Sequence, residues 1–280
     1  MKKEAILDFF IANGGLYSTK EDEIFQHIQS QSIYEVIRVM DRIPLYLEAH
    51  LERMRKSAEL LGYKILKSDQ EIIDEMKKLI EANKGPEMNI KLLCSNFHEK
   101  NHLFLQYFVE SHYPEEKIYD KGIHTILFHS QRENPNAKVV NLDLRKKISE
   151  KMKLEGAFEA ILVNQEGYIT EGSRSNIFFV KGEQAYTAPP GEVLLGVTRM
   201  RIMEICEKVG VNVIEEHIHE KEMLQMEGAF MTGTSVNVLP IHSIGNHVFT
   251  DIHHSVTEKI AQGYQADMIE YTNSCKIWSS

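Results

Sequence analysis

The sequence predicts a two-domain protein of the α/β (α+β) class, with a small α/β amino-terminal domain and a larger carboxy-terminal domain of mostly antiparallel sheet. Three observations support this prediction. The first 112 residues mix the periodicities of strands and helices. Most of the segments beyond residue 123 are short, alternating and separated by turn residues. A length of 280 residues suits one large or two modest domains, which we place at 1–112 and 123–280 with a linker at 113–122.

Alternating strands and two amphipathic helices define the first predicted domain. The segment "SIYEVIRVMDRIPLYL" alternates apolar and polar residues on both sides of a turn at 40–44, which predicts a hairpin. Apolar residues at helical spacing in "EAHLERMRKSAELLG" and "SDQEIIDEMKKLIEAN" predict two helices. The first ends near Gly62, and the second has Ser68 and Asp69 as candidate caps. The segments "NIKLLCS" and "LFLQYFVE" complete the domain as strands.

The linker and the second domain follow in the same way. "SHYPEEKIYDKG" is charged, contains a proline and lacks sustained periodicity, which is typical of a linker. Beyond it, "IHTILFHS" reads as a strand, "LDLRKKISEKMKLEG" as a helix, and "FEAILVNQEGYITEG" with "SNIFFVKGEQAYTA" as a β-meander. The helix "GVTRMRIMEICEKVG", two strands in "EGAFMTGTSVNVLPIHSIG" and a helix beginning near His254 complete the prediction.

Composition points to a cytoplasmic protein that acts on small molecules. The formal net charge is −9 and lysines are interleaved with acids, whereas binding nucleic acid needs clustered cations. The cysteines, Cys94, Cys206 and Cys275, are widely spaced, which fits a reducing compartment. Asp8 interrupts the apolar amino-terminal stretch, so it does not read as a signal peptide, and no apolar run approaches membrane-spanning length.

Three short segments are candidates for binding a phosphate group. "LLGVTRMRI", residues 194–202, places a glycine and a threonine at a helix amino terminus, where backbone amides point outward. "TGTS", residues 232–235, offers amides and hydroxyls in a turn. His50 and Arg53 lie one helical turn apart, and an arginine can contact a phosphate with two N–H groups. An ordinary helix end, an ordinary turn and a solvated charge are the alternatives at each place.

A metal site is the other chemistry that residue spacing allows. "CSNFHEKNH" puts Cys94, His98 and His102 at four-residue steps, which on a helix could hold a metal ion. Because both flanks read as strands, we expect an exposed hairpin there and no metal site.

The order of several motifs resembles the class IV (fold-type IV) aminotransferases that depend on pyridoxal phosphate. The motifs are "YEVIRV", "HLERMRKSAELLG", "AKVVN", "GAFEAILVNQEGYITEGSRSNIFFV", "LLGVTRMRI" and "FMTGTSVNVLPI", spanning about residues 32 to 245. The family includes D-amino-acid and branched-chain aminotransferases and 4-amino-4-deoxychorismate lyase. The resemblance implies a two-domain enzyme that holds pyridoxal 5'-phosphate in a cleft between its domains, and a homodimer.

Carried across by position, the resemblance implies a role for each matching residue. Lys138 in "AKVVN" would hold the cofactor aldehyde as a Schiff base, and Glu171 would face the pyridine nitrogen. Tyr34 would lie near the cofactor and the substrate, and Leu194 would pack against the ring. The residues implied to hold the phosphate are Arg53, Val197, Thr198, Gly233 and Thr234. A carboxylate at the ring nitrogen stabilises the pyridinium, and the lysine amine can act as the base at the substrate Cα.

The sequence departs from the family pattern where the substrate is bound. "EDEIFQHIQSQS" stands where family members carry a stretch close to DRGxxxGDG. D-amino-acid aminotransferases bind the substrate carboxylate with an arginine and a histidine on the strand before the linker, but "LQYFVESHYP" has no arginine. Two residues are therefore candidates for binding the substrate carboxylate. His112 lies at the end of this segment, and Arg174 lies in the turn "EGSRSN".

We expect a transaminase that moves an amino group between an aliphatic, branched-chain or D-amino acid and a 2-oxo acid. The alternatives are 4-amino-4-deoxychorismate lyase, a family member that binds the cofactor without turnover, and, remotely, a metal-dependent hydrolase. The lyase would use the same Lys138 and Glu171 but eliminate pyruvate.

Overall fold

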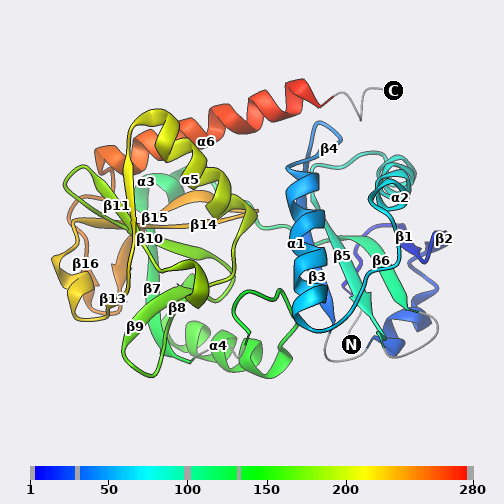
Figure 1. Cartoon of the computed structure of the whole chain (residues 1–280), viewed down its shortest axis with the longest axis horizontal. Coiled ribbons are helices and arrows are strands. Elements are labelled where there is room, and N and C mark those ends of the chain that lie inside the picture. The colour runs from blue at the N-terminus through cyan, green and yellow to red at the C-terminus, as the bar shows by residue number, and fades with distance from the viewer. Residues whose placement is uncertain (1–3, 29–31, 98–101, 131–133, 276–280) are drawn as a thin grey trace. The chain divides into compact units, whose positions relative to one another are not determined.

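The computed structural model describes residues 4–28, 32–97, 102–130 and 134–275, which form two compact units (Figure 1). Unit 1 comprises Met1–His112, Ala137–Asn141 and Met268–Ser280, and unit 2 comprises Tyr113–Asn136 and Leu142–Asp267, each within the described ranges. The mixture of helices with two sheets confirms the predicted fold class.

Unit 1 is built on an antiparallel sheet with the strand order β2-β1-β6-β5-β3-β4. Its strands are β1 (Phe9–Ala12), β2 (Gly15–Ser18), β3 (Ile33–Met40), β4 (Ile43–Pro44), β5 (Asn89–Ser95) and β6 (Leu103–Val109). Its helices are a 3-10 helix (Asp22–His27), α1 (Leu47–Leu60) and α2 (Asp69–Ala82).

Successive side chains along the strands of unit 1 point to opposite faces of the sheet, and each face packs into its own apolar cluster. On one face, residues such as Ile37 and Leu92 pack with Met54 of α1 and Met76 of α2. On the other face, a second cluster packs around Phe25. Because both faces are covered, the central strands β3, β5 and β6 are largely buried, and their side chains are closely packed.

Unit 2 is built on a larger, mostly antiparallel sheet, in which the order β12-β11-β10-β14-β15-β7-β8-β9-β13 includes three parallel pairs. Its first strands are β7 (Ile123–His129), β8 (Glu159–Val163), β9 (Tyr168–Gly172), β10 (Asn176–Lys181) and β11 (Gln184–Thr187). The others are β12 (Asn212–Glu215), β13 (Ile218–His219), β14 (Gly228–Gly233), β15 (Asn237–Ile244) and β16 (His247–Val248). Its helices are α3 (Glu116–Lys121), α4 (Leu142–Glu155) and α5 (Val197–Val209), with 3-10 helices at Pro190–Glu192 and Glu222–Gln225. Helix α6 (Ser255–Ser274) begins in unit 2 and ends in unit 1.

Most predicted elements are confirmed. The hairpin of β3 and β4 turns at Asp41 and Arg42, both with positive φ. Helix α2 begins with a capping box, because Ser68 and Glu71 each accept from the backbone amide of the other. The predicted linker at 113–122 contains helix α3, which has no buried residue.

One hairpin was not predicted. Strands β1 and β2 form it in the segment "FFIANGGLYS", with Asn13 and Gly14 at positive φ in the turn. An Asn-Gly pair between apolar segments is a strong hairpin signal, and here it lies at the end of the apolar amino-terminal stretch.

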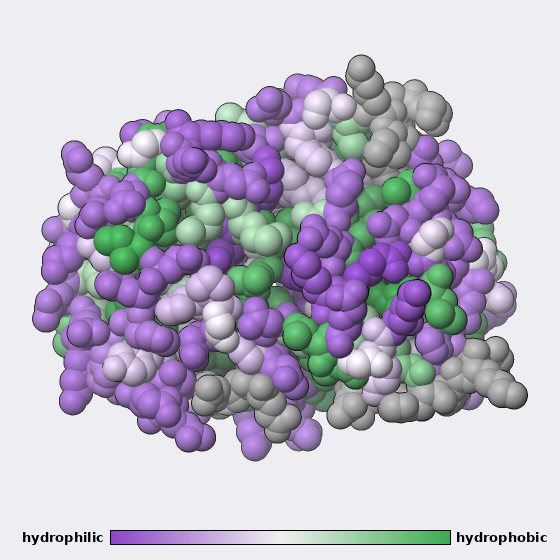
Figure 2. All heavy atoms as spheres, viewed as in Figure 1, coloured by the Kyte–Doolittle hydropathy of each residue, from purple (hydrophilic) through white to green (hydrophobic). Residues whose placement is uncertain are grey.

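Charged and polar side chains cover most of the face shown in Figure 2, and apolar side chains occur there in separate areas. Singly exposed apolar residues such as Leu154 are common on soluble surfaces. No helix in the described ranges has both the length and the apolar content needed to cross a bilayer.

Candidate active site

A buried cluster in unit 1 joins β3 to α1. Glu35 lies on the same face of β3 as Ile33 and Ile37, and therefore faces α1. The Arg53 guanidinium donates from Nε to Glu35 Oε1 at 2.8 Å and from Nη2 to Oε2 at 2.5 Å. His50, one turn before Arg53, places Nδ1 2.8 Å from the same Oε2. The predicted phosphate ligand is thus held by two contacts to one carboxylate.

Charges within this cluster are balanced. Burial favours a higher pKa for Glu35, but the Arg53 charge and the hydrogen bonds from His50 and Arg53 outweigh it and lower the pKa to about 2. For His50, burial disfavours the charged form and lowers the pKa, although the nearby Glu35 carboxylate acts in the opposite direction. At neutral pH, Glu35 is therefore a carboxylate, and His50 is a neutral imidazole that donates from Nδ1.

Lys138 lies in the short segment Ala137–Asn141, which hydrogen-bonds to β3. The Tyr34 amide donates to the Lys138 carbonyl at 3.2 Å, and the Val140 amide donates to the Ser32 carbonyl at 3.0 Å. The Lys138 amide donates to the Ser57 hydroxyl at 3.2 Å. Lys138 Nζ lies 4.9 Å from the centroid of the Tyr34 ring, so the structure brings these two predicted residues together.

A second lysine contacts the same ring. Lys91 Nζ lies 5.2 Å from the Tyr34 centroid and forms an ion pair with Glu4. Its side chain is only 4% exposed, which is rare for lysine.

In unit 2, Glu171 and Leu194 are in direct contact. Glu171 is the fourth residue of β9 and is 3% exposed. Its Oε2 accepts a hydrogen bond from the Leu194 amide at 3.2 Å, while the Asn176 side chain donates to the Leu194 carbonyl at 2.9 Å. The loop before α5 is therefore bound by two side chains, Glu171 before the turn and Asn176 after it.

The predicted phosphate-binding residues of unit 2 lie next to this loop. Gly196 is the N-cap of α5 and provides no side-chain cap, and Val197 and Thr198 are the buried first residues of the helix. Thr232 pairs with Asn176 across β14 and β10, and Gly233 and Thr234 follow it. The Asn176 side chain also lies beside Gly196 and Leu194, so the helix terminus and the "TGTS" turn both adjoin Asn176.

Two of the predicted substrate residues, His112 and Arg174, are exposed to solvent. His112 is 80% exposed in its side chain and lies 3.7 Å from Glu110. Arg174 is exposed in the turn after Glu171. His98 lies outside the described residues, and burial raises the pKa of Cys94 to about 12. Within the described ranges, no three His, Cys, Asp or Glu residues are grouped as a metal site.

Three buried polar residues in this description were not predicted: Glu35, Ser57 and Asn176. A signal for Glu35 exists, since it occupies a strand position of the same parity as Ile33 and Ile37, where an apolar residue is expected. No local pattern identifies Ser57, because its partner at Lys138 is 81 residues away.

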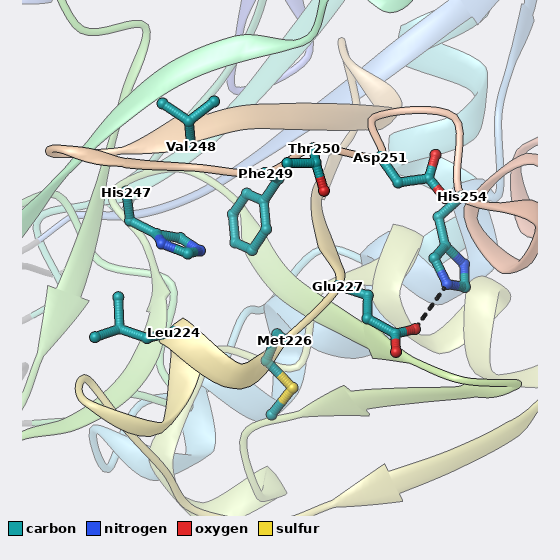
Figure 3. A pocket seen from close by; sticks show the side chains of 9 residues that line it. All are labelled: Leu224, Met226, Glu227, His247, Val248, Phe249, Thr250, Asp251 and His254. Carbon is teal, nitrogen blue, oxygen red and sulfur yellow. Dashed lines mark hydrogen bonds and ion pairs between the residues drawn. The ribbon is translucent and has the colours of Figure 1, made fainter.

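A separate cavity of about 400 Å³ lies in unit 2 (Figure 3). Its lining includes His247, Phe249 and the pair formed by His254 and Glu227, whose side chains are 3.3 Å apart. None of the predicted site residues lines this cavity.

Comparison with known proteins decides the family. The model of the amino-transferase class IV family matches residues 32–244. The chain belongs to the class IV aminotransferase family. Class IV aminotransferases are enzymes that depend on pyridoxal phosphate and move an amino group between an amino acid and a 2-oxo acid, as the sequence predicted for this chain.

Individual relatives of this class IV aminotransferase agree. It is 30% identical to a D-alanine aminotransferase of Bacillus licheniformis over 80% of its length and 82% of the relative's. It is 28% identical to a branched-chain-amino-acid aminotransferase of Pseudomonas aeruginosa over 78% of its length and 76% of the relative's. The fold matches a solved branched-chain amino acid aminotransferase of Thermoproteus uzoniensis, with a TM-score of 0.84, 21% identity and 98% of both chains covered. Another branched-chain aminotransferase that the fold matches, with a TM-score of 0.85 and 22% identity over 98% of both chains, was solved with pyridoxamine 5'-phosphate.

Proposed function

We propose that this aminotransferase binds pyridoxal 5'-phosphate through Lys138 and Glu171, which together with Tyr34 carry the chemistry. The observation behind this proposal is the grouping in unit 2, where Glu171, Leu194, the start of α5 and the "TGTS" turn are linked by hydrogen bonds and strand pairing. A buried carboxylate suits a protonated ring nitrogen, because the charge and the hydrogen bond compensate its desolvation.

The donors present fit a phosphate group. Arg53 supplies a guanidinium, and α5 starts without a side-chain cap, which leaves its first amides to other acceptors. The buried Thr232 hydroxyl finds no hydrogen-bond partner within the described ranges, and it precedes Gly233 and Thr234. We therefore propose that Arg53, Val197, Thr198, Gly233 and Thr234 hold the phosphate and that Leu194 packs on the ring.

The protein groups have separate tasks in the reaction. Pyridoxal phosphate, when bound, supplies an electron sink for the charge left on the substrate Cα. Glu171 keeps the ring nitrogen protonated, and the Lys138 amine takes the proton from Cα. Tyr34 keeps the Lys138 side chain in place, since its ring centroid lies 4.9 Å from Lys138 Nζ.

For the substrate, we propose a small aliphatic, branched-chain or D-amino acid with a 2-oxo acid as its partner. The names of the two curated relatives support this range. Arg174, with His112 as the alternative, would bind the substrate carboxylate, since an arginine can form a two-pronged contact with it. Arg174→Ala should then raise KM for the amino acid, and unchanged kinetics would remove Arg174 from this role.

We also propose a cytoplasmic homodimer. The three cysteines without a pairing pattern suit a reducing compartment, and closed two-fold dimers are the commonest oligomers of soluble enzymes. Sedimentation at several protein concentrations tests the dimer.

The visible spectrum of the purified protein tests the cofactor. We expect a band that amino acids change and that Lys138→Ala abolishes, while the exposed Lys147→Ala keeps it. A protein that stays colourless after addition of pyridoxal phosphate would contradict the proposal.

Turnover separates the remaining alternatives. Glu171→Gln should leave the fold intact and remove most activity, because a neutral amide holds the ring proton poorly. Continued release of pyruvate from 4-amino-4-deoxychorismate, without an added 2-oxo acid, would indicate a lyase. A coloured protein inert toward all D- and L-amino acids would indicate lost turnover.

A further inference from the structure

Glu159, the first residue of β8, is a buried carboxylate that binds the turn after Glu171. It is 1% exposed, and both of its oxygens accept hydrogen bonds. Oε1 accepts from the Ser173 hydroxyl at 2.5 Å, the Ser173 amide at 3.2 Å and the Ala160 amide at 2.8 Å. Oε2 accepts from the Ser175 hydroxyl at 2.9 Å and the Arg174 amide at 3.3 Å.

The turn at Gly172–Ser175 is also held by backbone hydrogen bonds, and its interior is tightly packed. The Gly172 amide donates to the Ser175 carbonyl at 2.8 Å, and the Ser173 amide also donates to the Ala160 carbonyl at 2.8 Å. A Cβ on Gly172 would lie 2.0 Å from the Ser175 hydroxyl oxygen and 3.2 Å from Glu159 Oε2. The side chain of Glu159 thus fills the space that the turn encloses.

The residues on either side of this turn hold the same loop. Glu171, just before the turn, accepts from the Leu194 amide, and Asn176, just after it, donates to the Leu194 carbonyl. The turn therefore sets the separation of the two side chains that hold Leu194. A shift of the turn would move the Glu171 carboxylate as well.

We propose that Glu159 is a positioning residue, which holds Glu171 in the place where it contacts the cofactor by fixing the turn at Gly172–Ser175. The inference rests on the proposed function of Glu171. Glu159 does not contact the cofactor itself, and acts through the backbone of the turn.

The donor set explains why this position needs a carboxylate. Three of the five donors to Glu159 are backbone amides, which cannot reverse their polarity, whereas the two serine hydroxyls can rotate. In Glu159→Gln, a side-chain NH₂ at the Oε1 position would face the Ala160 and Ser173 amides, and at the Oε2 position it would face the Arg174 amide. Either orientation loses hydrogen bonds and leaves buried donors without acceptors.

The test compares Glu159→Gln with Glu75→Gln, a matched change of a buried carboxylate in unit 1. Glu75 contacts Lys67 and the Gln106 side chain, and has no part in the proposed site. Hydrogen exchange of residues 172–176 in the apo-protein reports the turn without any cofactor. We expect exchange to be faster by about tenfold or more in Glu159→Gln, which corresponds to one decade in the opening equilibrium, and unchanged in Glu75→Gln.

The protein with bound pyridoxal phosphate then serves to test whether Glu171 has moved. A pH titration of the cofactor absorption should give a lower midpoint for loss of the ring proton in Glu159→Gln, by about 0.5 pH unit or more, and unchanged behaviour in Glu75→Gln. Ser175→Ala, which removes one donor to Oε2, should show a smaller shift in the same direction and serves if Glu159→Gln fails to fold.

Two results would overturn the inference: unchanged exchange at 172–176, or faster exchange with an unchanged ring-proton titration. In the second case Glu159 stabilises the turn but does not position Glu171. Failure of the proposed function is recognised separately, because the wild-type protein would then lack the Lys138-dependent band.

Discussion

Replacing Glu35 with glutamine should destabilise unit 1 in a way that depends on pH. Glu35 is fully buried, and its pKa falls from 4.5 to about 2 because Arg53 and His50 bind the carboxylate. A shift of this size corresponds to about 3 kcal/mol of stability at neutral pH. Glu35→Gln removes that charge and leaves the Arg53 guanidinium without its counter-ion, which costs on the order of 3–5 kcal/mol.

The sign of the pH dependence follows from the lowered pKa. The stabilisation is complete above pH 4.5 and is lost as the pH falls toward 2, where Glu35 becomes protonated in the folded protein. Urea denaturation of both proteins from pH 7 to pH 2.5 should show a large difference that narrows below pH 4.5. Glu52→Gln on α1 is the control, since the exposed pair with Lys56 contributes under about 1 kcal/mol. An effect of Glu35→Gln no larger than that of the control, or one independent of pH, would refute this reasoning.

Two further substitutions test the backbone around the site. Ser57→Ala should speed hydrogen exchange of the Lys138 amide by up to about tenfold, because a part-buried amide loses a hydrogen bond that contributes about 0.5–1.5 kcal/mol; unchanged exchange would count against this contact. Gly196→Ala should weaken binding of pyridoxal phosphate by about tenfold or more, measured by cofactor titration, because the new Cβ lies 2.2 Å from Asn176 Oδ1. Gly191→Ala, where nothing lies within 4 Å, is its control, and equal affinities for the two variants would contradict the prediction.

The elements with a regular local pattern could be predicted from the sequence. The strand at β3 alternates apolar and polar residues, and the helix at α2 carries its own capping box, so neighbouring residues alone indicate each structure. Helix α3 has only six residues and buries none of them, and for this reason it lacks the amphipathic pattern that reveals a helix. The hairpin of β1 and β2 has a clear turn signal at Asn13 and Gly14. The apolar residues before this turn also resemble the start of a signal peptide, and this resemblance obscured the strand pattern.

The candidate site required information that no local pattern contains. The resemblance to the family predicted Lys138 and Glu171 as site residues, but the contacts around them join residues far apart in sequence. Ser57 is 81 residues from Lys138, and Glu159 is 14 residues from Ser173. Pairing at such separations depends on the folded sheet, and a hydrophobic pattern cannot specify it for single polar residues.

The structure gives a physical reason why Lys138, the proposed catalytic lysine, can lie in a segment of only five residues. Such a segment has no helix or sheet of its own, but Tyr34 and Val140 join it to β3 through backbone hydrogen bonds, and Ser57 joins its backbone to α1. Strand β3 also carries Glu35, which holds the Arg53 guanidinium. Lys138, Tyr34 and Arg53 are therefore all connected to one buried strand. Glu171 and Leu194 are connected through the turn between Glu171 and Asn176. Because backbone hydrogen bonds in buried strands and turns open rarely, each set is held in place before a ligand binds, as efficient catalysis requires.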